Sequence, residues 1–210
     1  MAARPRKVTD DDILGATQRV MQRLAPGELT LAVIAAEAGV TAGALVQRFG
    51  SKRELLLELT RRFAAATNEM FDQLRAAEPS PIGTIRLYAD CMAQMGESPA
   101  TFAHHLAYLQ IDLTDPDFFE NLRTQARSTR AALRALVVEA MRARELKRQT
   151  DADALARALE VTITGSLWTW VFHQEGKAAE WMREDVDALL APYIVAAKKK
   201  RARRRSRTVS

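Results

Sequence analysis

The segment that most constrains the fold is residues 30–50, where two short helical stretches are separated by a glycine. Thr30 can cap the first stretch and Thr41 the second, because a threonine hydroxyl accepts a hydrogen bond from a free amide of a helix's first turn. Gly39 lies between the stretches, and a glycine just past a helix end favours a tight turn. Gly50 ends the second stretch. The pattern predicts a helix, a turn and a short helix over Ala42–Phe49.

The small and apolar residues of this segment indicate how the two helices pack. Ala35 is small enough for a close helix crossing, while Val40, Leu45 and Phe49 can hold the second helix against the first. This is the pattern of a helix-turn-helix, whose second helix can lie in the major groove of DNA. A helical corner with a purely structural role is the alternative. We expect residues 30–49 to bind double-stranded DNA.

The remaining chain also shows helical patterns. Thr9 and Asp12 form a capping box for a first helix, and Ser51 and Glu54 form another that opens a long fourth helix. No stretch alternates with period two, so we predict no sheet. The expected fold class is all-α, with a three-helix N-terminal domain that contains the helix-turn-helix and a larger helical domain after it. The later helices are predicted over residues 82–95, 99–112, 116–147, 151–174 and 178–197.

Positive charge is concentrated at the two ends of the chain. The net charge is +5, but residues 198–207 read KKKRARRRSR, with eight positive charges, and Arg4, Arg6 and Lys7 add three more. Such blocks stay disordered and attract polyanions. We expect the three N-terminal residues to contact DNA. For the C-terminal block, DNA contact and a role in solubility remain alternatives.

These observations predict four segments. They are a basic flexible arm (1–8), a helix-turn-helix DNA-binding domain (9–54), a helical regulatory and dimerisation domain (55–197) and a basic disordered tail (198–210). The fourth helix would bridge the two domains.

Few residues suggest chemistry beyond binding. Cys91 is the single cysteine, so no internal disulfide can form, and the adjacent His104 and His105 point about 100° apart on a helix. No glycine-rich phosphate loop or nucleophile elbow is present. We therefore expect no metal, no cofactor and no enzymatic activity. Without a secretory signal or a long apolar segment, the protein is expected to be soluble and cytoplasmic, with no membrane partner.

The stretch LTLAVIAAEAGVTAGALVQRFGSKRELLLEL resembles the TetR (tetracycline repressor) family of transcriptional regulators. The family pattern runs from a threonine through I-A-x-x-A-G-V-[ST]-x-G-x-L-Y-x-[HY]-F to [SN]-K-x-x-L. The match covers about 50 residues. The positions that match are Thr30, Ile34, Ala35, Ala38, Gly39, Val40, Thr41, Gly43, Leu45, Phe49, Ser51, Lys52 and Leu55.

The chain departs from this pattern at two positions: Val46 replaces the usual tyrosine and Arg48 replaces the second aromatic residue. We interpret the change as altered specificity or affinity. The resemblance implies phosphate contacts by Thr30, Thr41 and Lys52. It also implies a groove-facing set in which Gln47 suits adenine, Gly43 allows close approach, and Arg48 could add a charge. The remaining members of this set are Ala42, Ala44 and Val46.

For the second domain, the resemblance implies a pocket for a small apolar or amphipathic ligand and a helical homodimer interface. Both sets could equally be ordinary core of one subunit. The pocket candidates are Met92, Met95, Phe102, His105, Tyr108, Leu109, Phe119, Leu122, Trp168 and Phe172. The interface candidates are Leu155, Leu159, Ile163, Leu167, Trp181, Leu189 and Ile194.

Together these features predict a ligand-responsive transcriptional regulator, most simply a repressor that binds a palindromic operator as a homodimer. Two alternatives remain. One is a non-specific DNA-binding protein that relies on its basic tails. The other is a helical small-molecule carrier or enzyme with a vestigial motif, whose activity would not depend on Gln47 or Lys52.

Overall fold

A computed structural model describes residues 8–96 and 98–195 and confirms the all-α prediction. Within these residues no β-strand forms. One isolated antiparallel β-bridge joins Leu146 to Ile194. The helices are α1 (Asp10–Met21), α2 (Leu31–Ala38), α3 (Ala42–Phe49), α4 (Lys52–Ala77), α5 (Pro81–Ala93), the 3₁₀ turn η1 (Gln94–Gly96), α6 (Pro99–Thr114), α7 (Pro116–Arg142), α8 (Ala152–His173) and α9 (Ala178–Leu190).

The first four helices begin where the sequence predicts. Thr30, Thr41 and Ser51 each accept a hydrogen bond from the amide three residues later, at the starts of α2, α3 and α4. Thr9 and Asp12 form the expected reciprocal box at the start of α1. These caps satisfy amides that have no partner inside the helix, so local sequence is sufficient to position these helix starts.

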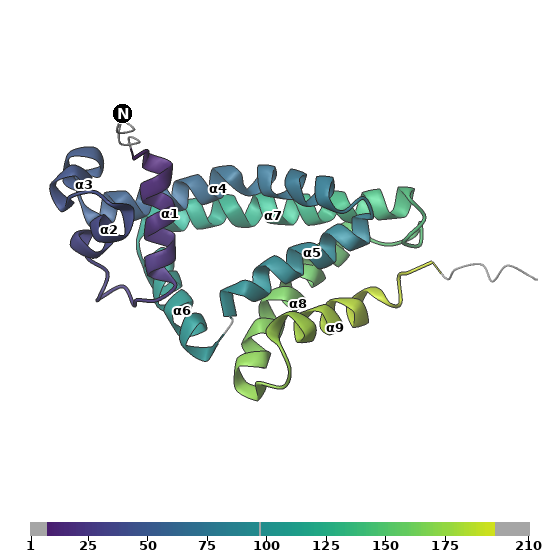
Figure 1. Cartoon of the computed structure of the whole chain (residues 1–210). Coiled ribbons are helices and arrows are strands. Elements are labelled where there is room, and N and C mark those ends of the chain that lie inside the picture. Colours follow the sequence, from purple (N-terminus) through teal and green to yellow (C-terminus); the bar gives the residue numbers. More distant parts are fainter. Residues whose placement is uncertain (1–7, 97, 196–210) are drawn as a thin grey trace, which may run out of the picture.

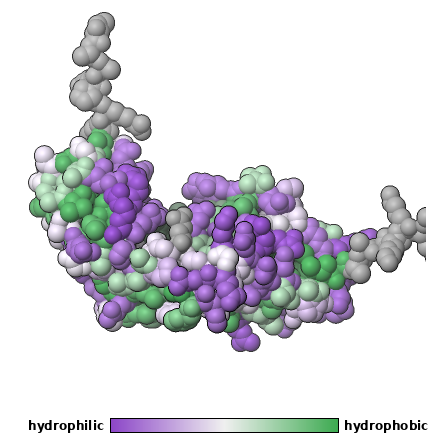
Figure 2. Space-filling view, turned by 60° about the horizontal axis from the view of Figure 1, so that its bottom comes forward, coloured by the Kyte–Doolittle hydropathy of each residue, from purple (hydrophilic) through white to green (hydrophobic). Residues whose placement is uncertain are grey.

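The helices form an elongated molecule (Figure 1). At one end lie α1, α2 and α3. From there α4 runs along the molecule beside α7, and α5, α8 and α9 form the other end. In the space-filling view the N-terminal helices form a separate lobe, with a saddle between it and the larger lobe (Figure 2). The described chain begins beside the N-terminal lobe and ends at the opposite end of the molecule (Figure 1).

Two apolar cores correspond to the two lobes. One joins α1, α2, α3 and the first turns of α4 through residues such as Ile13, Ile34, Leu45 and Leu55. The other joins α5, α7, α8, α9 and the far half of α4. Because α4 contributes to both cores, it connects the two lobes as one continuous helix.

Two predicted helices are too long. α7 ends at Arg142 instead of residue 147, because Arg144 adopts a left-handed conformation with φ of 61°. α9 ends at Leu190 instead of residue 197, shortly before Pro192, since proline cannot continue a helix. The two freed segments pair with each other, as the Lys147 amide donates to the Tyr193 carbonyl at 2.9 Å and the Val195 amide to the Glu145 carbonyl at 2.9 Å.

No single helix in the described ranges is long and apolar enough to cross a membrane. In these ranges, α2 and α3 taken together have the length and apolar composition of a membrane span, but the chain bends by 104° between them.

Candidate nucleic-acid interface

The helices α2 and α3 form a helix-turn-helix. The chain bends by 104° between them, within the range for this motif. At the turn, Gly39 has φ of 70°, a left-handed conformation that glycine adopts without a steric penalty. The Val40 amide donates to the Ala35 carbonyl at 3.0 Å, which closes the end of α2.

The inner side of α3 is anchored by Leu45, which is fully buried in the N-terminal core. Ala42 and Phe49 are half-buried beside it. Ile34 and Ala35 of α2 are buried in the same core. The packing therefore fixes which side of α3 faces outward.

The outward side of α3 carries Gly43 and Gln47, both exposed and one helical turn apart. Val46 is 48% exposed on the flank of this side, and Ala44 is half-buried. Of the predicted groove-facing residues, Ala42 points most toward the core. A β-carbon built at Gly43 would approach only the Thr41 hydroxyl, at 3.9 Å, so the chain's own packing does not require glycine there.

The two cap threonines present polar groups beside this face. Thr30 and Thr41 are exposed, and their hydroxyl oxygens accept from the Val33 amide at 3.2 Å and the Ala44 amide at 3.1 Å. Each hydroxyl keeps its own proton for a donor bond. The N-termini of α2 and α3 therefore suit phosphate oxygens.

Lys52 lies in the first turn of α4 and is half-buried. Its ammonium donates to the Pro26 carbonyl at 3.2 Å and to the Leu29 carbonyl at 2.8 Å. Lys52 thus holds the loop between α1 and α2, and its third proton could still reach a phosphate.

Arg48 turns along the flank of α3 toward the start of α1. Its Nη1 donates to the Val8 carbonyl at 2.9 Å and lies 3.5 Å from Asp10 Oδ1. The basic residues Arg4, Arg6 and Lys7, and the C-terminal basic block, lie outside the described residues.

Contacts from α6 and the start of α7 join the two lobes. The Tyr108 hydroxyl donates to the Leu24 carbonyl at 2.9 Å, just after α1. Arg53, in the first turn of α4, donates to Asp115 at 2.8 Å and Asp117 at 2.7 Å, and its guanidinium holds the pKa of the Asp115 carboxyl below its usual value. Sequence patterns do not reveal this cluster, because Arg53 precedes its partners by more than 60 residues.

The predicted ligand-binding residues are only partly brought together. Phe102 and Trp168 pack edge to face with ring centroids 5.2 Å apart, and His105 lies near Phe102. Burial lowers the pKa of His105. Met92 and Met95 pack against the same core.

Three of the predicted pocket residues lie elsewhere. Tyr108 is buried in the N-terminal core, so it links the lobes instead of facing Trp168. Phe119 lies beneath the Arg123 guanidinium, 5.9 Å from the ring centre, and Phe172 is 75% exposed on α8. Of the predicted set, Phe102, His105 and Trp168 are the residues whose rings come together.

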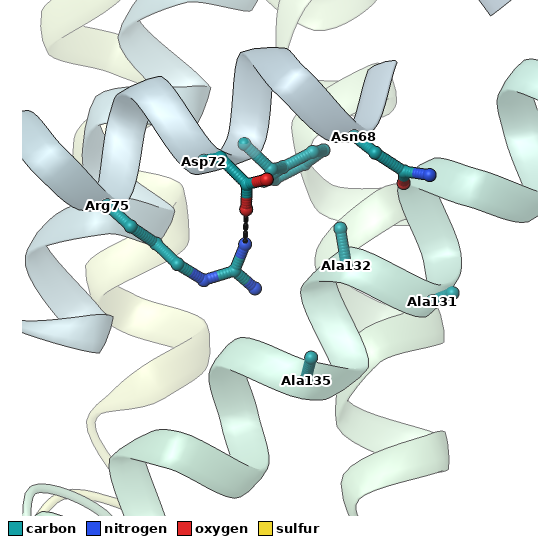
Figure 3. A pocket seen from close by; sticks show the side chains of 7 residues that line it. Asn68, Asp72, Arg75, Ala131, Ala132 and Ala135 are labelled. Atoms are coloured by element: carbon teal, nitrogen blue, oxygen red, sulfur yellow. Dashed lines mark hydrogen bonds and ion pairs between the residues drawn. The ribbon is translucent and has the colours of Figure 1, made fainter. Parts of the chain in front are cut away.

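Two hollows on the surface are lined by residues outside the predicted ligand-binding set. One, of about 270 Å³, lies between α4 and α7, where Asn68, Asp72 and Arg75 face Ala131, Ala132 and Ala135 (Figure 3). The other, of about 410 Å³, lies between α1 and α2 and includes Val8, Asp11 and Glu37. Neither contains a predicted ligand-binding residue. The described ranges contain no group of three or more His, Cys, Asp or Glu residues placed to hold a metal ion.

The predicted interface residues mostly face the chain's own core. Leu155, Leu159, Ile163 and Leu167 are buried on the inner side of α8, so they have little surface left for a second subunit. The other three predicted residues, Trp181, Leu189 and Ile194, are half-buried against the same core.

A different side of α8 is apolar and exposed. Val161 is 67% exposed and Phe172 75% exposed, with Trp168 between them. Gly165 lies in the same row, and a β-carbon built there would have no neighbour within 4 Å. The spacing of four, three and four residues places all four positions on one helix face.

Residues 13–59 match the model of the family described as bacterial regulatory proteins, tetR family. These residues extend from α1 into α4 and include the whole helix-turn-helix. No curated protein matches the chain by sequence.

Solved structures share the fold over most of the chain. A TetR transcription regulator from Haloarcula marismortui has a TM-score of 0.71 at 18% identity, covering 89% of this chain and 98% of its own. SmeT of Stenotrophomonas maltophilia, the repressor of the multidrug efflux pump SmeDEF, has 0.64 at 20%, covering 91% and 93%. The regulator FadR of Bacillus subtilis, in complex with stearoyl-CoA, has 0.64 at 15%, covering 87% and 98%. At these identities the likeness establishes the fold.

Proposed function

Because residues 13–59 carry the N-terminal domain of the tetR family and the chain has the fold of TetR transcription regulators, we propose that it represses transcription as a ligand-responsive homodimer on a palindromic operator. The observation that carries this proposal is the outward face of α3. Gly43 and Gln47 are exposed on a short helix whose opposite side is held by the buried Leu45. A helix presented in this way fits a major groove.

Within the groove, Gln47 is the base-reading residue of this proposal. Its amide can bond an adenine edge in two places, while Val46 can contact a thymine methyl group. Thr30, Thr41 and Lys52 then hold phosphates on either side and set the register of α3. The protein acts in the cytoplasm, where its operator lies.

The direct test is a gel shift at physiological salt with DNA from upstream of the protein's own gene. We expect a palindromic site to bind at least about a thousandfold more tightly than random DNA of equal length. Equal affinity for both would contradict the regulator proposal.

Substituting Gln47→Ala is expected to weaken operator binding by about ten- to a hundredfold and to relax the preference at one base pair of each half-site. The reason is loss of the amide that pairs with a base edge. Binding of wild type and variant to a set of single-base operator variants measures both effects. Gln73→Ala, an exposed glutamine in the distant half of α4, serves as the matched control. Equal discrimination by wild type and Gln47→Ala would exclude base readout by Gln47.

Substituting Gly43→Ala is expected to change stability and binding in opposite directions. The new methyl group meets no close neighbour, and alanine stabilises a helical position relative to glycine, by less than about 1 kcal/mol for a residue such as Gly43 in the first turn. The same methyl group would lie where DNA approaches, so operator affinity should fall.

Thermal unfolding and gel shift on the same preparation measure the two effects. Gly15→Ala in α1 is the control, since its nearest foreign atom would be Arg19 Nη1 at 3.7 Å. It should gain stability without losing affinity. Unchanged operator affinity in Gly43→Ala would show that DNA does not approach Gly43 closely.

Homodimerisation is supported by the exposed row on α8 formed by Val161, Gly165, Trp168 and Phe172. An apolar helix face that is open in one subunit can be buried against the same face of a second. Two copies would then present two α3 helices, which must lie about 34–36 Å apart to enter successive major grooves.

The ligand response is supported by the contacts between the lobes. A ligand near Phe102 and Trp168 would act on α6, and α6 bonds the loop after α1 through the Tyr108 hydroxyl and the Leu24 carbonyl. If one arrangement of α6 binds the ligand better, the ligand shifts the dimer toward a spacing of α3 helices that no longer fits the operator. An apolar or amphipathic small molecule fits the aromatic and methionine surroundings.

Non-specific DNA binding through the basic tail is the competing function, and removing residues 198–210 distinguishes the two. The described part of the chain ends at the opposite end of the molecule from α3 (Figure 1). We therefore expect the shortened protein to retain its preference for the operator over random DNA. A large, equal loss of affinity for both would favour the tail-dependent alternative.

A further inference from the structure

The basic side chains of residues 8–54 are all bound by acceptors of the protein itself. A basic residue whose donors are engaged in this way is less free to read a base edge. The pairs are Arg19 and Arg23 with Glu37, Arg48 with the Val8 carbonyl, Lys52 with the Pro26 and Leu29 carbonyls, and Arg53 with Asp115 and Asp117.

Arg48 is the charged residue of α3, yet its guanidinium is directed toward the start of α1. Its Nη1 donates to the Val8 carbonyl at 2.9 Å and lies 3.5 Å from Asp10 Oδ1, and its side chain is only 29% exposed. At about 100° per residue, Arg48 lies about 140° around the helix from Gly43. Reading guanine would require two guanidinium donors aimed at O6 and N7 in the groove. Arg48 would have to give up its bond to Val8 to do so.

Gln47 has the opposite situation. Its side chain is exposed on the outward face, and its amide has no hydrogen-bond partner among the residues that the structure describes. The amide carries one acceptor and one donor group, which match the N6 donor and the N7 acceptor of adenine. Guanine presents two acceptors in the same place, so the Gln47 oxygen would face guanine O6 without a proton between them.

Val46 supplies an apolar contact beside Gln47. It is 48% exposed and lies about 60° around the helix from Gly43, on the flank opposite to Arg48. Its methyl groups form no hydrogen bonds. The thymine methyl is the apolar group that a base pair presents in the major groove, so contact between the two would remove apolar surface from water.

We propose, resting on the DNA-binding function above, that α3 reads A·T pairs and no guanine: Gln47 bonds an adenine, Val46 contacts a thymine methyl group, and Arg48 is withheld from the bases by Val8 and Asp10. Because Val46 and Gln47 are adjacent on α3, the bases that they contact lie in the same or in neighbouring base pairs. The DNA that this chain selects therefore has A·T pairs in each half-site where α3 lies.

Base analogues in the DNA test the proposal without changing the protein. The full-length protein first selects its site from duplexes with two randomised half-sites. Single bases of the selected site are then replaced in both half-sites, and affinities are measured by gel shift. Replacing thymine by uracil removes only the methyl group, and at one position we expect a loss of about tenfold. Replacing adenine by 7-deazaadenine removes only N7, and at one position we expect a similar loss.

Protein variants assign each loss to its residue. In Val46→Ala the thymine and uracil sites should bind within about twofold of each other, and in Gln47→Ala the adenine and 7-deazaadenine sites should do so. Val195→Ala changes an exposed valine at the far end of the described chain and should keep the full preference for thymine. Arg48→Ala should keep the base preferences of wild type at every position. Thermal unfolding checks that each variant is folded.

Guanine analogues provide the result that would overturn the proposal. Replacing any guanine of the half-site by 7-deazaguanine should change the affinity of wild type by less than about twofold. A tenfold loss would contradict the proposal, and its absence in Arg48→Ala would identify Arg48 as a reader of guanine. Equal binding of thymine and uracil at every position would also contradict it. If wild type selects no sequence over random DNA, the proposed function fails; if it selects a site that depends on guanine N7, this inference alone fails.

Discussion

If the proposed homodimer forms through this face of α8, substituting Gly165→Arg is expected to give folded monomers and to weaken operator binding by about a hundredfold or more, because each monomer holds only one half-site. Sedimentation or light scattering measures the mass in solution, and gel shift measures the affinity. Circular dichroism shows whether the monomer remains folded.

Gly165 is the most informative position because the monomer leaves space there. A β-carbon at Gly165 has no neighbour within 4 Å, and arginine has a higher helix propensity than glycine. A single subunit should therefore tolerate the change. In a dimer packed through Val161, Trp168 and Phe172, the new charged side chain would lie at the centre of a buried apolar surface, where an unpaired charge is costly.

Ala66→Arg is the matched control, since it adds the same side chain at an exposed position of α4. It should leave both the mass and the operator affinity unchanged. A Gly165→Arg protein that stays dimeric with wild-type affinity would show that two subunits associate through another surface.

The N-terminal lobe could be predicted from sequence because its determinants are local. Thr30 and Thr41 each bond an amide three residues later, and Gly39 adopts the left-handed turn that no other residue adopts as easily. These interactions span few residues, so the chain itself displays them. The bounds of α3 match the prediction for this reason.

The ends of α7 and α9 depend on distant residues and could not be predicted. The segment after Arg142 pairs through its backbone with the segment around Ile194, about 50 residues later. Helix-favouring residues such as Glu145 continue the helical pattern in the sequence. Tertiary pairing outweighs that weak local preference.

The outward face of α8 could not be predicted for another reason. α8 is apolar on nearly all sides, with Leu159 and Leu167 inward and Val161 and Phe172 outward. Apolar periodicity cannot distinguish an inner from an outer face in such a helix. Only the packing of α8 against α7 and α9 shows which row remains exposed.

The roles of Lys52 and Arg48 also required coordinates. The sequence predicts a phosphate contact for Lys52 and an added charge in the groove-facing set for Arg48. In the structure they donate to backbone carbonyls, Lys52 to the loop after α1 and Arg48 to Val8. Because any residue carries a carbonyl, side-chain patterns give no sign of such a partner.

Substituting Leu45→Ala is expected to abolish operator binding. The larger lobe of the variant is expected to stay folded. Leu45 is the buried residue of α3, and truncating a fully buried leucine lowers the free energy of unfolding by about 2–5 kcal/mol. A helix of eight residues is marginal without tertiary packing, so the loss should fall mainly on α3. Urea unfolding, hydrogen exchange of the α3 amides and gel shift measure stability, local order and binding.

Leu133→Ala is the control, because Leu133 is equally buried but lies on α7 in the core of the larger lobe. It should lower the free energy of unfolding by a similar amount, yet leave operator affinity within about threefold at temperatures where the protein is folded, since its cavity is remote from α3. Wild-type affinity in Leu45→Ala would mean that Ala42 and Phe49 alone hold α3 in place. A loss of binding as large in Leu133→Ala would mean that the two cores unfold together, so that the position of α3 depends on the whole chain.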